Sequence, residues 1–118
     1  NVASTAAFQA GPNMAIYYAS KAFVLSFTEA LHEELKGEVK VSALCPGATA
    51  SEFEATAHLQ GTLLFKAGSA SADSVVAASL AHRNCAIVIP GARNILMVWL
   101  GKLSPRFLTR RIAGRLQR

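Results

Sequence analysis

The chain has 118 residues, of which 52% are apolar and 16% are charged, and its formal net charge is +5. This length suits a single domain with a buried core, and the composition excludes an intrinsically disordered protein. The longest apolar run, Ile95 to Leu100, is far shorter than the roughly 20 residues that a membrane-spanning helix requires.

The N-terminal part of the chain predicts a strand end followed by a long helix. Residues 1–7 are small and are expected to end a strand, and Asn13 is expected to cap a helix over residues 14–36. Apolar residues recur on this helix at intervals of three and four and form one stripe: Ile16, Ala19, Phe23, Phe27, Ala30 and Leu31. Gly37 is typical of the C′ position that ends a helix.

The remaining elements alternate between strands and helices. They are expected in this order: a strand over 39–45 ended by Pro-Gly, a loop with a short helix over 48–71, a helix over 72–84 capped by Ser71 or Asp73, a strand over 85–91, and helices near 94–100 and 105–116. The first of these strands is apolar enough to be at least partly buried on both faces. This alternation predicts an α/β fold with a parallel sheet, and since only two complete strands are present, the chain is expected to be half of a fold.

The two cysteines, Cys45 and Cys85, each adjoin an apolar run. In a chain where no signal peptide can be read, two such thiols are expected to be buried and unpaired in a reducing compartment, so we expect a cytoplasmic protein. No C-x-x-C motif or histidine pair offers a metal site. Because the first residue is Asn1 and not methionine, we expect the chain to begin within a longer protein.

A possible catalytic pair lies near the start of the long helix. Tyr17 and Lys21 are four residues apart, so on a helix they point the same way. An ammonium beside a phenol stabilises the phenolate, which makes such a tyrosine a plausible proton donor or acceptor. Tyr18 has Ala22 at the same offset and lacks such a partner. The spacing alone also allows an interface aromatic beside a surface lysine.

Three segments in order resemble the short-chain dehydrogenase/reductase family. YYASK, which ends at Lys21, is similar to its Tyr-x-x-x-Lys signature, and NVAST places Ser4 thirteen residues before Tyr17, where the family has its active-site serine. LCPGATAS, residues 44–51, is similar to the family's strand that ends in Pro-Gly. The resemblance covers about residues 1–91.

The resemblance implies a hydride-transferring oxidoreductase that reduces a carbonyl or oxidises an alcohol with NAD(P). In that case Tyr17 donates or accepts the proton, Ser4 holds the same substrate oxygen, and Lys21 tunes Tyr17 and binds the nicotinamide ribose. The resemblance further implies that the cofactor contacts six residues: Tyr17, Lys21, Pro46, Gly47, Thr49 and Ser51. Phe8 and Phe53 flank the two active-site loops and are candidates for an apolar substrate wall, although either could equally belong to the core.

The family's glycine-rich cofactor loop has no counterpart in this sequence. The resemblance therefore implies the C-terminal half of a doubly wound, Rossmann-like parallel sheet with flanking helices: residues 1–92 form the catalytic half and residues 93–118 a basic helical tail. NAD and NADP cannot be distinguished, because the residue that reads the ribose lies upstream. The alternatives are a non-catalytic remnant that packs against a partner, and a sugar-nucleotide epimerase or dehydratase with the same Tyr-Lys pair.

Two kinds of partner follow from the remaining surface. The apolar stripe of the first helix is expected to serve a homo-oligomer, as in many relatives. Residues 93–118 contain seven Lys or Arg and no acid, and Leu108, Ile112 and Leu116 form a narrow row among arginines. This tail could rest on an anionic membrane surface, or it could cover the substrate pocket or pack in an oligomer, which the narrow row favours. Nucleic acid is not an expected partner, because stacking aromatics are not interleaved with the basic residues.

Overall fold

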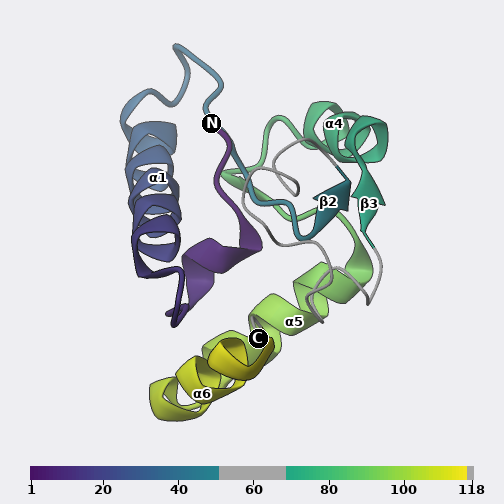
Figure 1. Cartoon of the computed structure of the whole chain (residues 1–118). Coiled ribbons are helices and arrows are strands. Elements are labelled where there is room, and N and C mark those ends of the chain that lie inside the picture. Colours follow the sequence, from purple (N-terminus) through teal and green to yellow (C-terminus); the bar gives the residue numbers. More distant parts are fainter. Residues whose placement is uncertain (51–68, 117–118) are drawn as a thin grey trace.

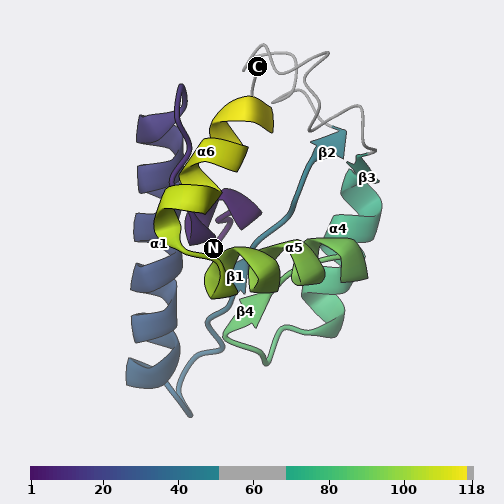
Figure 2. The ribbon, with the colours of Figure 1, turned by 90° about the horizontal axis from the view of Figure 1, so that it is seen from below.

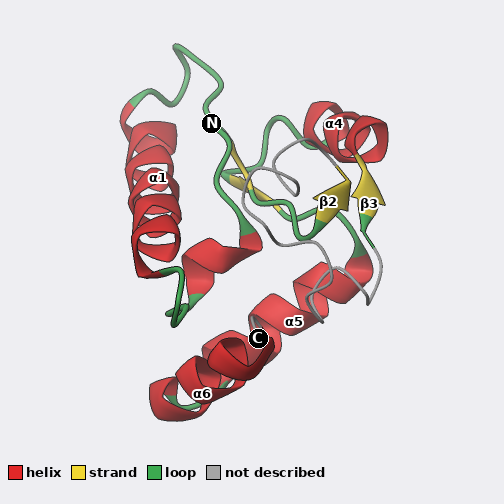
Figure 3. Ribbon diagram, in the orientation of Figure 1, coloured by secondary structure: helices red, strands yellow, loops and turns green. Residues whose placement is uncertain are grey.

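The computed structural model describes residues 1–50 and 69–116 (Figure 1). A layer of short strands lies between helix α1 (Ala15–Glu34) on one side and helix α4 (Ala72–Ala81) on the other, and Figure 3 shows this alternation of helices and strands. The strand pairs are parallel. The predicted α/β class, with a parallel sheet and flanking helices, is confirmed.

The centre of the sheet is strand β1 (Ala43–Leu44). It pairs in parallel with β4 (Ile87–Val88), and on its other edge Leu44 forms a parallel bridge with Val2. Ala43 and Cys45 are fully buried on one face, and Leu44 on the other face is half-buried, so the strand is at least partly buried on both faces as predicted. In the described ranges the predicted strand 39–45 reduces to residues 43–44 and the predicted strand 85–91 to residues 87–88. Residues 39 and 40 are still exposed as the chain leaves the turn after α1.

A second parallel pair joins β2 (Thr49–Ala50) to β3 (Ala70–Ser71). This pair was not predicted, since the sequence from 48 to 71 is rich in small residues and lacks an alternating pattern. Ser71 then caps α4 as expected: its Oγ accepts a hydrogen bond from the backbone N–H of Ser74 at 3.3 Å.

The ends of α1 differ from the prediction in detail. Asn13 is not the N-cap, because it has a φ of 70° and sits inside the preceding turn, where asparagine is one of the few residues that tolerates this conformation. Met14 occupies the cap position without a side-chain hydrogen bond. Gly37 has the left-handed φ of 94°, but it lies two residues beyond the C-cap, Leu35, and not one.

The buried face of α1 is not the predicted apolar stripe. Tyr18, Leu25 and Thr28 are the buried residues of this helix, whereas Ile16, Phe23 and Phe27 are 50–88% exposed. The core that α1 covers is built mainly from small side chains, including Ala3, Ala7, Ala43 and Cys45, so one leucine and a threonine fill the contact. The large apolar residues therefore point away from the sheet.

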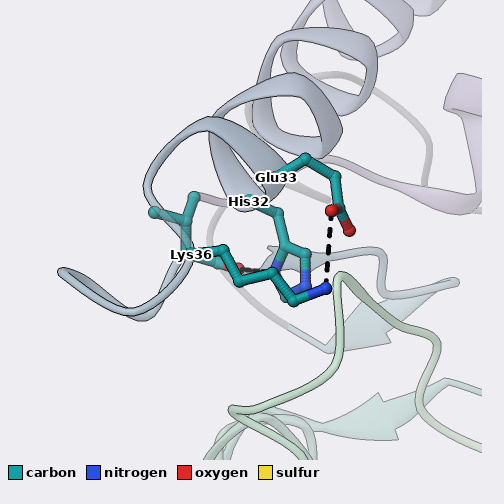
Figure 4. A network of polar contacts seen from close by, with 4 residues as sticks. His32, Glu33 and Lys36 are labelled. Carbon is teal, nitrogen blue, oxygen red and sulfur yellow. Dashed lines mark hydrogen bonds and ion pairs between the residues drawn. The ribbon is translucent and has the colours of Figure 1, made fainter.

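Two polar contacts hold the end of α1 against the chain that follows (Figure 4). His32 Nδ1 lies 2.6 Å from the carbonyl oxygen of Val41, across the turn. Lys36 Nζ lies 3.5 Å from Glu33 Oε2, and both side chains are largely exposed. An exposed ion pair of this kind contributes little to stability, so the histidine contact is the one that ties the helix to the sheet.

The chain ends in two helices, α5 (Ala92–Leu103) and α6 (Arg106–Leu116). Both predicted helices are confirmed, the first one longer than predicted. They lie on the same side of the molecule, at the bottom of Figure 1 and toward the viewer in Figure 2. Val98 of α5 and Ala113 of α6 are buried, and Gly114 packs close to Pro12. None of the helices in the described ranges has the length and hydropathy of a membrane span.

Candidate active site

Ser4 lies where the first chain segment leaves the sheet. It is buried, and its Oγ accepts a hydrogen bond from the Ala6 N–H at 3.1 Å, which caps the short 3-10 helix η1 (Thr5–Phe8). The Ser4 hydroxyl also donates to the Pro46 carbonyl oxygen at 3.5 Å, a long and weak contact. The next residue, Thr5, donates its backbone N–H to the same oxygen at 2.9 Å. These bonds bring two of the predicted site segments together.

Tyr17 and Lys21 lie one turn apart in α1, as their spacing requires. Lys21 Nζ is 5.8 Å from the centroid of the Tyr17 ring, within the range of a cation–π contact. The same ammonium donates to the carbonyl oxygen of Val2 at 3.1 Å. Because Val2 is two residues before Ser4, this bond anchors α1 to the strand that carries the serine.

The structure separates the two adjacent tyrosines. Tyr18 is buried and its ring lies against Gly11, where an added Cβ would be 2.3 Å from the ring. Tyr17 is half-buried, and its ring meets that of Tyr18 edge to face with centroids 6.0 Å apart. Tyr18 therefore fixes the start of α1 to the preceding turn, while Tyr17 is the accessible member of the pair.

The Pro46–Gly47 turn follows β1 directly and is half-buried. Thr49 Oγ1 donates to the Gly47 carbonyl oxygen at 3.1 Å, which holds the turn as the chain enters β2. Thr49 is thus close to the turn, and its contact with the cofactor stays a prediction. The other two predicted contacts in this region, Ser51 and Phe53, lie outside the described residues.

Asn94 on α5 supports this turn, and sequence reasoning missed it. Its carboxamide packs against Gly47 so closely that a Cβ on that glycine would lie 2.5 Å from Asn94 Oδ1. Asn94 Nδ2 donates to the Pro90 carbonyl oxygen at 2.7 Å, which fixes the orientation of the side chain. A lone asparagine 47 residues beyond the glycine carries no local signal, so only the tertiary contact identifies it.

A cavity of about 350 Å³ lies between η1, the Pro46–Gly47 turn and α5. Its described lining includes Thr5, Phe8, Asn94 and Met97, but not Ser4, Tyr17 or Lys21. Phe8 lines the cavity and also packs against the core, so its role as a substrate wall stays a prediction. Lys102 Nζ lies 4.9 Å from the Phe8 ring centroid, so one side of this ring is covered by a cation.

The two cysteines are both free, but they differ in burial. Cys45 is fully buried beside Ser4, and burial raises the pKa of its thiol to about 11. This thiol therefore stays protonated at neutral pH and is a core residue, not a nucleophile. Cys85 is exposed, which contradicts the expectation that both would be buried. Among the described residues, no group of three or more His, Cys, Asp or Glu side chains is placed to hold a metal ion.

Comparison with known proteins points to one family. The family model described as short chain dehydrogenase matches residues 1–60. The 11-beta-hydroxysteroid dehydrogenases 1A and 1B of Arabidopsis thaliana are each 38% identical to this chain over 60 residues, which are 51% of this chain and 17% of each relative.

Solved structures extend the likeness beyond that segment. A 7beta-hydroxysteroid dehydrogenase structure matches 96% of this chain with a TM-score of 0.80 and 26% identity, and the match covers 46% of that protein. A bulky-bulky ketone specific alcohol dehydrogenase from Comamonas testosteroni matches 86% of the chain with a TM-score of 0.54 and 24% identity, which supports the fold alone.

The chain spans 17% of the length of the curated relatives and 46% of the 7beta-hydroxysteroid dehydrogenase structure. The segment matched by the family model nevertheless covers just over half of the chain, and it contains the serine, the Tyr-x-x-x-Lys pair and the Pro-Gly turn. The resemblance seen in YYASK is therefore confirmed at the level of the family: this chain belongs to the short chain dehydrogenase family.

Proposed function

We propose that the protein carrying this chain is an NAD(P)-dependent oxidoreductase that interconverts a carbonyl and an alcohol, and that this chain is its C-terminal catalytic half. The observation that carries the proposal is the bond from Lys21 Nζ to the Val2 carbonyl oxygen, because it fixes the Tyr17 helix to the strand that leads into Ser4. The comparisons support an oxidoreductase, and they do not favour the epimerase or dehydratase.

Ser4 would hold the substrate oxygen. Its Oγ already accepts from the Ala6 N–H at 3.1 Å, so its own O–H is left to donate. In the described structure that O–H is directed at the Pro46 carbonyl oxygen over 3.5 Å, a bond weak enough for a substrate oxygen to replace. A buried hydroxyl placed in this way stabilises negative charge that develops on the oxygen during the reaction.

Tyr17 would move the proton. In the reducing direction the carbonyl carbon accepts a hydride and the Tyr17 O–H donates a proton to the carbonyl oxygen; in the oxidising direction the phenolate takes the alcohol proton. The Lys21 ammonium lies beside this ring, with its Nζ 5.8 Å from the centroid. Proton transfer by a positioned side chain of this kind contributes roughly 10²–10⁴-fold to a rate.

The residues present fit the nicotinamide end of NAD(P). An ammonium has three donor hydrogens, and Lys21 uses one of them at Val2, so it retains donors for ribose hydroxyls. The Pro46–Thr49 segment offers backbone donors and acceptors at the end of a parallel strand, where such ligands bind in open α/β sheets. When bound, the nicotinamide supplies or accepts the hydride. The choice between NAD and NADP stays open.

The substrate would be an apolar alcohol or ketone. Phe8 and Met97 contribute apolar surface to the cavity beside η1, and the Thr5 hydroxyl and the Asn94 carboxamide contribute polar groups. Three of the similar proteins are named as hydroxysteroid dehydrogenases. A hydroxysteroid and its ketosteroid are therefore the first pair to test, followed by smaller cyclic alcohols.

The test uses the full-length protein with NADH or NADPH and a panel of ketosteroids, cyclic ketones and the matching alcohols. We expect reduced nicotinamide to be consumed with a ketone, and to be produced from the oxidised cofactor with the alcohol. A protein that binds NAD(P) but transfers hydride to none of these substrates would contradict the proposed reaction. A protein that binds neither cofactor would support the non-catalytic remnant instead.

The homo-oligomer expected from the resemblance would use the outer row of α1, which comprises Ile16, Phe23 and Phe27. The rings of Phe23 and Phe27 stack with centroids 5.9 Å apart and planes 6° apart, and both are at least half exposed. Sedimentation of the full-length protein with Phe23→Glu should show a smaller species than the wild type. An unchanged mass would place the oligomer contact, if one exists, elsewhere.

A further inference from the structure

The outer side of α5 is apolar along its whole length. Ile95, Leu96, Trp99, Leu100 and Leu103 are 42–79% exposed, and their spacing of three and four places them on one side of the helix. The opposite side meets the body of the protein, since Val98 is buried and Asn94 and Gly101 line the cavity. The exposed apolar residues of α5 are therefore not the ones that pack this helix against the rest of the chain.

Helix α6 adds three exposed apolar side chains, and the exposed Arg111 and Arg115 lie between them on the same side of the helix. Phe107, Leu108 and Ile112 are 41–53% exposed, whereas Ala113 is buried. Both helices lie along one side of the molecule, toward the viewer in Figure 2. We call the eight exposed apolar residues together the α5–α6 face: Ile95, Leu96, Trp99, Leu100, Leu103, Phe107, Leu108 and Ile112. Large apolar side chains exposed together on neighbouring helices mark candidate interaction surfaces, and the α5–α6 face is one of them.

The charges around this face have one sign. Arg93, Lys102, Arg106, Arg110, Arg111 and Arg115 are exposed, and the sequence from 93 to 118 contains no Asp or Glu. Lys102 Nζ lies 5.7 Å from the Trp99 ring centroid, so a cation and the chain's one tryptophan meet at the border of the apolar row. Tryptophan and long basic side chains are the residues that populate the boundary between lipid headgroups and acyl chains.

The positive charge around the α5–α6 face favours an anionic bilayer over a second copy of the chain as its partner. A second copy docked through the same face would bring two all-basic rims together, because a two-fold interface places equal patches opposite each other. Like charges placed opposite one another oppose that arrangement. An anionic bilayer provides both an apolar layer for the exposed row and negative headgroups for the rim.

We propose that the α5–α6 face docks on an anionic phospholipid surface, with both helices lying along the bilayer. The apolar side chains would enter the boundary between headgroups and acyl chains, and the basic side chains would lie among the headgroups. The proposal concerns this surface alone, and it does not depend on the reaction proposed for Ser4 and Tyr17.

The experiment measures binding of the full-length protein to vesicles by sedimentation. The vesicles are phosphatidylcholine alone or phosphatidylcholine with phosphatidylglycerol, each at low and at high salt. We expect at least about a tenfold preference for the anionic vesicles, reduced at high salt because ions screen exposed charges. Trp99→Ser combined with Leu103→Ser should abolish binding, and Arg110→Gln combined with Arg111→Gln should weaken it several-fold.

Matched controls are available away from the α5–α6 face. Val76→Ser with Leu80→Ser removes exposed apolar side chains from α4, and Lys36→Gln with Lys40→Gln removes two exposed charges. These controls should bind as the wild type does, and circular dichroism should show native helix in every variant. Absence of binding to anionic vesicles, or equal loss in these control variants, overturns the proposal. So does a self-association that only the α5 variant abolishes while no vesicle is bound.

Discussion

Helices α1 and α5 both contact η1. They differ in the side chains that face the core and in the charges beside their exposed apolar residues. Helix α1 directs Tyr18 and Thr28 into the core and reaches Val2 with Lys21, so its inner side carries the proposed chemistry. Helix α5 directs Asn94 and Gly101 toward the cavity, so its inner side supports and lines the site. The side chains of the proposed reaction thus lie on the α1 side of η1, and those that support and line the cavity lie on the α5 side.

The outer sides of the two helices differ in charge. The exposed apolar row of α1 is followed by Glu29, Glu33 and Lys36, which carry both signs, whereas the α5–α6 face has basic neighbours alone. An exposed apolar row does not identify its partner by itself. The charged residues beside the row indicate the partner. A protein surface can be complementary to charges of both signs, whereas an anionic bilayer is complementary only to positive charges.

The largest effect should come from the chemistry on α1. We expect Tyr17→Phe to lower kcat of the full-length enzyme by roughly 10²–10⁴-fold, because the proton donor is removed. Nicotinamide cofactor affinity and vesicle binding should be unchanged. Steady-state kinetics and fluorescence titration with the cofactor measure the two quantities.

Tyr18→Phe is the matched control for this substitution, since it removes the same hydroxyl from the buried neighbour. It should leave kcat within a few-fold of the wild type, because the buried Tyr18 hydroxyl has no part in the proposed proton transfer. Equal losses of kcat in the two variants would refute the assignment of the proton to Tyr17.

A second pair of variants compares how tightly the two helices pack. In Gly11→Ala the new methyl group would lie 2.3 Å from the buried Tyr18 ring, so we expect a loss of about 1–3 kcal/mol in the free energy of unfolding. In Gly101→Ala the nearest atom is 3.7 Å away, and alanine favours the helix, so stability should rise by about 0.5–1 kcal/mol. Urea unfolding of both variants measures these changes. An unchanged free energy of unfolding in Gly11→Ala would mean that the Tyr18 ring can shift to admit the methyl group.

The contact between α5 and the Pro46–Gly47 turn can be tested by a double-mutant cycle. Gly47→Ala places a Cβ 2.5 Å from Asn94 Oδ1 and should cost about 1–2 kcal/mol of stability and weaken cofactor binding several-fold. Asn94→Ala removes the obstacle together with the bond to Pro90, so it should cost about 1 kcal/mol alone.

In the double variant the methyl group occupies the space that Asn94 leaves, so the combined loss should be smaller than the sum of the single losses. Urea unfolding and cofactor titration of all four proteins give the coupling. Strict additivity would show that Asn94 does not position the turn.

The smallest effect concerns pH and the buried thiol. Burial raises the pKa of Cys45 from 9.0 to about 11, so the folded state holds this proton more tightly than the unfolded state does. The resulting stability is complete below pH 9.0 and is lost as the pH rises toward about 11, by about 1 kcal/mol at pH 10. Urea unfolding at about pH 8 and pH 10 measures this loss.

Variants at the two cysteines isolate the effect from other groups that titrate in this range. Cys45→Ala should lose this part of the pH dependence, although its absolute stability falls. Cys85→Ala, at the exposed thiol, should retain it. The same pH dependence in wild type and Cys45→Ala would assign it to groups other than the thiol.

The sequence by itself determined the α/β class, the family and the Tyr17–Lys21 pair. It also determined the position of the α-helices in the described residues to within a few residues, but not the short 3-10 helix η1. These features depend on residues close together in the chain: the period of a helix, the four-residue spacing of a pair, and the Pro-Gly that ends a strand. The single-sign charge of the tail is likewise a property of the sequence alone.

Tertiary structure decided which side of each helix is buried and which side chains meet. The apolar stripe of α1 faces outward because the opposing core is built from small residues, which no local pattern reports. Lys21 reaches Val2 across 19 residues, and Asn94 supports Gly47 across 47. Contacts over such separations arise when the parallel strands bring distant segments together, so they are decided by the packing of the sheet and not by the residues that flank them.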